Sequence, residues 1–160
     1  MTASWWERVI RAAMQIELRD LQPTPVDHEL LRQVAERTVA KVAGALDHLS
    51  VALVSDERIA QVNEQFRNRP GPTDVIAFEA EADAEGVAGE VIISVDTAAR
   101  QAAEAGHDLH RELCLLVAHG VLHVLGYDDE QPAGAAEMTR LQDQILSELE
   151  VLASSDEQLG

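Results

Sequence analysis

Cysteine is almost absent from this chain. Its 160 residues include a single cysteine, Cys114. One thiol excludes an internal disulfide framework and a zinc site built from thiolates, because both need several cysteines. Any metal site in this protein must therefore use nitrogen and oxygen ligands. The low cysteine content also favours a reducing compartment, and we expect the protein to be cytoplasmic.

Long apolar runs are also missing. The N-terminal segment is interrupted by Glu7, Arg8 and Arg11 before an apolar stretch long enough for a signal peptide can form. No later segment approaches the roughly 20 apolar residues that a membrane-spanning helix needs. We therefore expect no targeting sequence and no membrane partner.

Basic residues are scarce, with 12 Lys and Arg against 29 Asp and Glu and a net charge of -17. A strongly anionic protein repels nucleic-acid phosphates, so this composition argues against a nucleic-acid partner. The distribution weakens that objection, because residues 1–69 are nearly balanced in charge whereas residues 70–160 hold most of the acidic excess. A cationic surface is therefore possible only in the first part, where its candidates are Arg67 and Arg69 in a loop, and Arg32, Arg37 and Lys41 on a helix, which are more often solvated charges of a helix face.

The length and the 46% hydrophobic content fit one compact domain. We assign residues 1–150 to this domain and residues 151–160 to a flexible acidic tail. Alternating or buried apolar patterns predict strands at residues 14–21, 49–55, 74–79 and 90–96. Helical periodicity, with Asp27 and Asp56 as N-caps, predicts helices at residues 28–46, 57–66, 97–106, 107–126 and 132–152.

The order of these elements predicts an α+β fold. We expect a single mixed β-sheet of about four strands packed against about five helices, with the histidine-bearing helix in the helical layer. Residues 67–74 form a turn-rich loop, because two prolines and a glycine forbid a continuous helix or central strand. Residues 80–89 are small and acidic and are predicted to be irregular.

The most informative stretch is "AHGVLHVLGYDDE" at residues 118–130. Residues four apart on a helix project from the same face, so His119 and His123 can direct their ring nitrogens to one point. An isolated pair of this kind is more often structural, but here the helix is almost wholly apolar and buried imidazoles need partners. Gly126 lets the chain reverse, which returns Asp128 or Asp129 toward the pair. The stretch therefore predicts a metal site.

Three protein ligands and one open position are typical of a catalytic metal, whereas structural zinc sites fill all four positions with protein ligands. A metal of this kind lowers the pKa of bound water toward neutrality and so favours hydrolysis. Zinc peptidases with a His-Glu-x-x-His motif carry a glutamate general base beside the first histidine. In this chain that position is Gly120, so the ordinary peptidase interpretation lacks its base.

These residues resemble a known family. The segment "HGVLHVLGYDD" is similar to the signature of the YbeY family of bacterial endoribonucleases, which act as rRNA maturation factors. Three further segments resemble the family in the same order, and the resemblance runs from about residue 50 to residue 149. They are "VNEQFRNRPGPTDVIAFE" at residues 62–79, "GEVIIS" at residues 89–94 and "MTRLQDQIL" at residues 138–146.

The resemblance implies that His119 and His123 bind one Zn²⁺ per chain and that Arg67 acts on the RNA phosphate. The third ligand implied by position is Asp129, where the family carries a histidine. An aspartate oxygen is a normal zinc ligand, although its negative charge leaves bound water less acidic than three imidazoles would. The alternatives are that Asp129 lies beside the ion without binding it, or that Asp128 or Glu130 is the ligand.

The implied activity is that of a single-strand-specific, metal-dependent endoribonuclease. The resemblance implies action in small-subunit rRNA 3′-end maturation and ribosome quality control, with single-stranded RNA and the ribosomal subunit or its proteins, rather than DNA, as partners. One alternative is a metal hydrolase acting on peptides or small molecules. Another is a ribosome-assembly factor that binds rRNA or a ribosomal protein without cutting, which the charge of -17 favours.

Other polar residues near these motifs are expected to have structural roles. Asp74 braces the loop before a strand, and His107 and His110 lie at the start of the histidine-bearing helix as surface or capping residues. Cys114 lies on the apolar face of that helix, where we expect it to act as a small core residue.

Overall fold

In the computed structural model, the backbone is described for residues 14–159 and the side chains for residues 14–150. A four-stranded sheet and five helices form this part of the chain, which confirms the predicted α+β class. The elements in chain order are β1 (Gln15–Asp20), α2 (His28–Lys41), β2 (His48–Val54), α3 (Asp56–Arg67), β3 (Val75–Asp83), β4 (Gly86–Ser94), α4 (Val95–Ala105), α5 (Leu109–Val124) and α6 (Pro132–Leu159). None of the described helices is both long and apolar enough to cross a membrane.

The sheet is mixed and has the strand order β1-β2-β4-β3. β1, β2 and β4 are parallel, whereas β3 pairs with β4 in an antiparallel hairpin. Leu18, Val51 and Val91 align across the three parallel strands. Because successive residues of a strand point to opposite faces, this register gathers apolar side chains on one face of the sheet.

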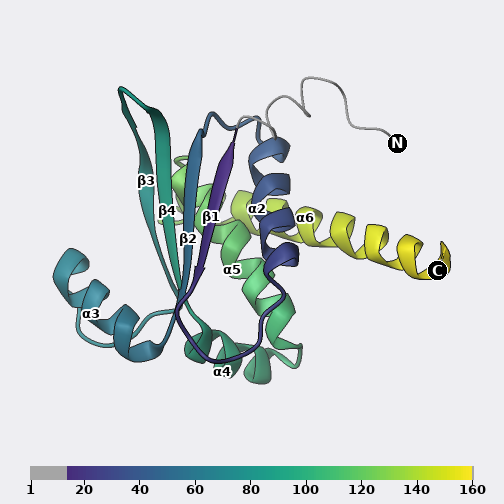
Figure 1. The fold of residues 1–160 in the computed structure, drawn as a ribbon, viewed down its shortest axis with the longest axis horizontal. Helices are drawn as coiled ribbons and strands as arrows, with labels where there is room; N and C mark the ends of the chain where they lie inside the picture. The colour runs from purple at the N-terminus through teal and green to yellow at the C-terminus, as the bar shows by residue number, and fades with distance from the viewer. Residues whose placement is uncertain (1–13, 160) are drawn as a thin grey trace.

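Helices lie on both sides of the sheet (Figure 1). α2, α5 and α6 form a layer on the apolar face, and α3 lies on the other side. The α3 contact is a small separate cluster in which Ile59 packs with Val54, Ile76 and Ile92. α5 is the central helix of the larger layer, because it contacts β3, β4, α2, α4 and α6.

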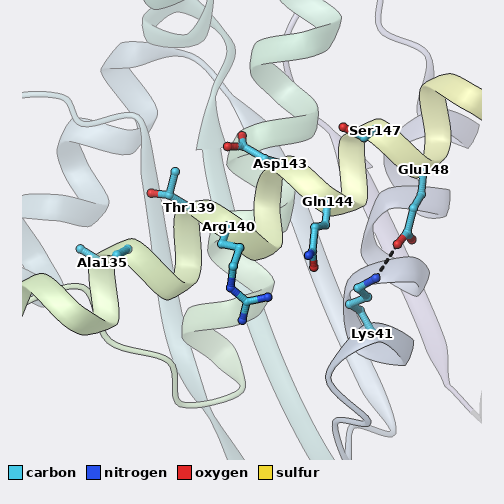
Figure 2. Close-up of a pocket in the computed structure, with 9 residues that line it drawn as sticks. Lys41, Ala135, Thr139, Arg140, Asp143, Gln144, Ser147 and Glu148 are labelled. Carbon is cyan, nitrogen blue, oxygen red and sulfur yellow. Dashed lines mark hydrogen bonds and ion pairs between the residues drawn. The ribbon is translucent and has the colours of Figure 1, made fainter.

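α6 packs with one face and exposes the other. Up to residue 150, where its side chains are described, the buried ones are Met138, Leu141, Ile145 and Leu146. On the exposed side, a shallow groove runs between α6 and the end of α2, where Lys41 and Glu148 form an ion pair (Figure 2). This ion pair joins the two helices at the edge of the layer.

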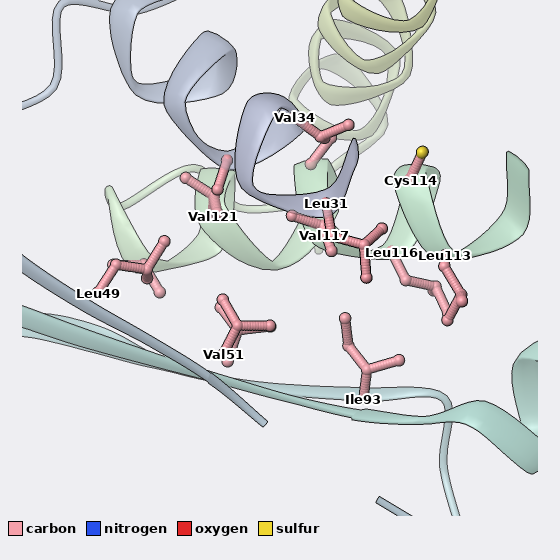
Figure 3. Packing of buried hydrophobic residues seen from close by; sticks show 14 of the residues in the cluster. Leu31, Val34, Leu49, Val51, Ile93, Leu113, Cys114, Leu116, Val117 and Val121 are labelled. Atoms are coloured by element: carbon pink, nitrogen blue, oxygen red, sulfur yellow. The ribbon is translucent and has the colours of Figure 1, made fainter. Parts of the chain in front are cut away.

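The main core lies between the sheet and the helical layer (Figure 3). Leu49, Val51 and Ile93 of the sheet point toward Val117 and Val121 of α5. All five side chains are fully or almost fully buried. Burial of one such side chain stabilises a fold by about 1.5–3 kcal/mol, so this packing fixes the position of α5 on the sheet.

A polar cluster joins α3 to α4 below the sheet. The carboxylate of Asp56 accepts hydrogen bonds from Ser94 Oγ at 2.7 Å and Thr97 Oγ1 at 2.6 Å, and it forms an ion pair with Arg100 at 2.8 Å. Burial raises the pKa of Asp56, but the hydrogen bonds from Arg100, Thr97 and Ser94 outweigh it and lower the pKa to about 2. Asp56 therefore stays ionised and holds the two helices together.

Two predicted features of the first helices were wrong. The helix predicted over residues 28–46 ends at Lys41, because Ala43 adopts a left-handed conformation with φ of 52°. Ser55, and not Asp56, is the N-cap of α3, since the Ser55 side chain accepts a hydrogen bond from the Arg58 amide at 3.3 Å. The Asp56 carboxylate instead bonds to Ser94, Thr97 and Arg100, as described above.

The segment 80–89 was also predicted wrongly, because it forms the hairpin between β3 and β4 rather than irregular structure. Most of this part of β3 is exposed, so its small and acidic side chains do not show the alternation of a half-buried strand. β4 ends at Ser94, two residues earlier than predicted, and Ser94 caps α4. α6 continues to Leu159, so that most of the predicted tail is helical; the domain boundary at residue 150 and the flexibility of the tail stay predictions.

Candidate metal site

The candidate site lies where α5 ends. His119 and His123 are one turn apart near the C-terminus of α5. The helix ends in a Schellman motif, in which the Gly126 amide donates to the His123 carbonyl and the Tyr127 amide donates to the Leu122 carbonyl, both at 3.0 Å. Gly126 has φ of 96°, which a residue with a side chain rarely adopts. This turn reverses the chain, as the sequence predicted.

The reversal brings Asp129 to the two histidines. The Nε2 atoms of His119 and His123 are 3.1 Å apart. Asp129 Oδ2 lies 3.5 Å from His119 Nε2 and 3.6 Å from His123 Nε2. Ligands bound to zinc at 2.0–2.1 Å in a tetrahedron are about 3.3 Å from one another. The three atoms therefore form a triangle of the size of one face of a zinc coordination tetrahedron, and the group can bind a metal ion.

Solvent reaches this group of atoms. The two histidine side chains are about one quarter exposed and the Asp129 side chain is 43% exposed. Three protein ligands leave one position of a tetrahedral ion for water or substrate, which is the arrangement of a catalytic rather than a structural metal. The geometry is thus compatible with hydrolysis of a substrate that approaches from the surface.

The other acidic residues of the loop are used differently. Asp128 Oδ1 accepts a hydrogen bond from the Glu130 amide at 2.9 Å, so this carboxylate shapes the turn. Neither Asp128 nor Glu130 belongs to the group of donor atoms that the described residues bring together. The geometry therefore favours Asp129 over both alternatives considered from the sequence.

Gly120 has a packing role that the sequence did not reveal. A β-carbon at this position would lie 2.6 Å from Val91 Cγ1 on β4. The residue after His119 therefore faces the sheet and not the metal site. A glutamate at this position could not serve as a general base, which separates this site from that of the His-Glu-x-x-His peptidases.

One polar contact to the site comes from α6. Gln142 Oε1 lies 2.8 Å from His119 Nδ1, at hydrogen-bond distance. Met138, Leu141 and Ile145 lie on the buried face of this helix, and Gln142 was not among the site residues predicted from the sequence. The spacing of these residues could have indicated that Gln142 points inward, because it lies four residues after Met138 and three before Ile145 and so belongs to the same face of the helix.

Arg67 is not part of this group of residues. It is exposed at the last position of α3, and its side chain forms no hydrogen bond or salt bridge with the other described residues. Asn63 holds the loop that follows, because its Nδ2 donates to the Gly71 carbonyl at 3.0 Å. The loop leads to Val75, a residue of β3 that lies beside Gly120 of α5. Arg67 thus ends a helix that packs on the face of the sheet opposite α5, and the loop after it leads to the edge strand β3.

The remaining polar residues have the structural roles that the sequence predicted. Asp74 Oδ1 accepts a hydrogen bond from the Val75 amide at 2.7 Å. His107 Nε2 lies 2.6 Å from Glu112 Oε2, at hydrogen-bond distance. His110 Nε2 accepts a hydrogen bond from the Asp27 amide at 3.0 Å. Cys114 is buried, and burial raises the pKa of its thiol to about 12.

Comparison with known proteins places this geometry in a family. The family model described as Endoribonuclease YbeY matches residues 15–150, which include β1 to β4, α2 to α5 and most of α6. The chain belongs to the YbeY family. This result confirms the resemblance found in the sequence, and the matched region contains the two histidines and Asp129.

Individual relatives agree with the family match. The Endoribonuclease YbeY of Thermobifida fusca is 37% identical over 144 residues, covering 84% of this chain and 93% of the relative. That of Moorella thermoacetica is 42% identical over 139 residues, covering 77% and 88%. The solution structure of TM1509 from Thermotoga maritima is similar in fold, with a TM-score of 0.61 and 29% identity over 89% of this chain and 93% of that one.

Proposed function

We propose that this YbeY-family protein is a single-strand-specific, zinc-dependent endoribonuclease. The observation that carries the proposal is the triangle of His119, His123 and Asp129 donor atoms, whose edges of 3.1, 3.5 and 3.6 Å fit a zinc ion. The relatives' name, Endoribonuclease YbeY, supports RNA as the substrate and phosphodiester cleavage as the reaction. We assign one Zn²⁺ to each chain.

The chemistry divides between the ion and the chain. A zinc ion supplies Lewis-acid polarisation of the phosphodiester and lowers the pKa of water. The two imidazoles and the Asp129 carboxylate would hold the ion and leave its fourth coordination position free. The negative charge of Asp129 would make a bound ion a weaker Lewis acid than three neutral ligands would. Position 120 supplies no general base, because it is a glycine whose missing side chain would point at the sheet and away from the site.

Arg67 is proposed to bind the RNA backbone. A guanidinium group can hold a phosphate by two parallel hydrogen bonds and stabilise its charge. Arg67 is exposed at the end of α3, and the loop after it reaches Val75 beside α5. An RNA strand that passes around the β3 edge of the sheet can therefore contact Arg67 on one side and the histidines on the other.

The cellular role follows from the family resemblance. We propose that the protein acts in the cytoplasm on the 3′ end of small-subunit rRNA and in ribosome quality control, in contact with the ribosomal subunit or its proteins. A second candidate is an assembly factor that binds rRNA or a ribosomal protein without cutting it. The net charge of -17 favours this candidate, because it weakens binding to free RNA.

RNA cleavage by purified protein separates the two candidates. Single-stranded and double-stranded RNA are incubated with zinc-loaded wild type and with the His119→Ala and Arg67→Ala variants. Arg69→Ala, which removes the arginine two positions later in the loop that follows α3, is the matched control. Wild type and Arg69→Ala should cut the single strand, whereas the other two variants should lose most of this activity. Equal cleavage by every variant indicates a contaminating nuclease and overturns the enzyme assignment.

A further inference from the structure

Gln142 of α6 lies at hydrogen-bond distance from His119 of α5, one of the two histidines of the site. We infer that Gln142 is a positioning residue that sets the tautomer and the ring orientation of His119 for metal binding. The inference rests on the metal site of the proposed function. It concerns how that site is prepared before the ion binds, and it assigns to α6 a role beyond packing.

The direction of the hydrogen bond follows from the geometry of the site. His119 Nε2 faces His123 and Asp129, so this is the nitrogen whose lone pair would bind a cation at the site. A neutral imidazole with a free lone pair on Nε2 carries its proton on Nδ1. Gln142 Oε1 lies 2.8 Å from Nδ1 and accepts that proton's hydrogen bond. The contact thus favours the tautomer that can bind metal.

The position of Gln142 is fixed by the packing of its helix. Leu122 of α5 packs with Met138 and Leu141 of α6 in a buried cluster beside the site. At the start of α6, a β-carbon at Gly134 would lie 2.2 Å from the carbonyl oxygen of Asp128, so this helix closely approaches the loop that carries Asp129. Two contacts therefore hold α6 against both parts of the site, and Gln142 directly follows Leu141, one of the residues that make them.

The two histidines are not equivalent in this respect. Within the described residues, His123 has its hydrogen bond through Nε2 to His119 and no bond through Nδ1. Among the residues that the structure describes, only His119 of the pair has a hydrogen bond to another helix. In other proteins, loss of the residue that hydrogen-bonds to the ring nitrogen not bound to the metal lowers metal affinity or activity by roughly 10- to 100-fold. We expect Gln142 to have an effect of this size through His119 alone.

The test measures zinc affinity of the full chain by competition with a chromophoric chelator. Gln142→Leu keeps the approximate size of the side chain and removes the acceptor, so the Kd for Zn²⁺ should rise by about 10- to 100-fold. Gln142→Glu keeps an acceptor and should bind at least as tightly as wild type. Gln144→Leu, on the exposed side of the same helix (Figure 2), is the matched control and should leave the Kd unchanged.

A second readout does not depend on the metal. Nitrogen-15 NMR of the metal-free protein reports which ring nitrogen of His119 carries the proton, and the preference for Nδ1 should weaken in Gln142→Leu but not in Gln144→Leu. A purely structural role would lower the free energy of unfolding without this change. Unchanged zinc affinity and tautomer in Gln142→Leu overturn the inference. Tight zinc binding without RNA cleavage by wild type would overturn the proposed function alone.

Discussion

Gly120 of α5 lies so close to Val91 of β4 that a β-carbon on the glycine would approach the valine Cγ1 to 2.6 Å. The absence of a side chain therefore allows the histidine-bearing helix to lie against the sheet. Val91 is fully buried, so it has little room to move away. The distance between α5 and β4 in turn determines where His119, the preceding residue, can point.

Gly120→Ala should destabilise the protein for this reason. Overpacking of a filled core costs about 1–3 kcal/mol, and the better helix propensity of alanine offsets up to about 1 kcal/mol. We expect the free energy of unfolding, measured by urea denaturation, to fall by about 1–2 kcal/mol. In a double-mutant cycle, Val91→Ala should reduce the cost of Gly120→Ala because it removes the methyl groups that clash. Strict additivity would show that this contact is not the cause.

Local patterns predicted much of the fold and the site. The spacing of His119 and His123, and the glycine that ends their helix, are properties of one short segment, so the approach of Asp128 or Asp129 could be inferred without tertiary information, and the family resemblance pointed to Asp129. The hairpin at residues 80–89 was missed because its exposed strands lack an apolar alternation.

Contacts between residues far apart in the sequence could not be predicted from local patterns. The bond of Gln142 to His119 depends on how α6 packs on α5, and nothing local to either residue specifies it. The end of α3 was predicted well, but the side of the sheet that α3 covers depends on the partners of Ile59. The position of Arg67 relative to the histidines therefore needed the structure.

Cys114 should be unreactive in the folded protein. Its thiol is buried, and burial raises its pKa to about 12, so almost no thiolate is present near pH 8. We expect no reaction with a disulfide reagent such as Ellman's reagent until the protein is unfolded in guanidinium chloride. Ser147→Cys, on the exposed side of α6, provides a positive control that should react at once. Rapid reaction of native wild type would show that α5 opens readily.

Asp56 should make the protein less stable in acid. Its pKa is about 2 in the folded protein and 3.8 when unperturbed, so the ionised carboxylate stabilises the fold above pH 4 and this contribution is lost as the pH falls toward 2. The shift corresponds to about 2 kcal/mol. Asp56→Asn should lower the free energy of unfolding by about that amount at pH 7, with a smaller difference from wild type at pH 3.

The control for this experiment lies on the same helix. Glu64 is an exposed residue of α3, and Glu64→Gln should leave the pH dependence of unfolding as it is in wild type. Unfolding is followed by circular dichroism in urea at several pH values. A constant difference between wild type and Asp56→Asn from pH 7 to pH 3 would mean that the Asp56 carboxylate does not titrate with the low pKa that its hydrogen bonds imply.

Asp129 should contribute to metal binding more than its neighbour in the loop does. Its Oδ2 completes the triangle with the two histidine nitrogens, whereas Asp128 bonds to the Glu130 amide. We expect Asp129→Ala to weaken Zn²⁺ binding at least tenfold and Asp128→Ala to change it little, as measured by chelator competition. Asp129→His should keep the zinc, because an imidazole nitrogen is an equally suitable ligand. If Asp129→Ala binds zinc as tightly as wild type, the carboxylate is not a ligand, and the two histidines must share the ion with water alone or with another group.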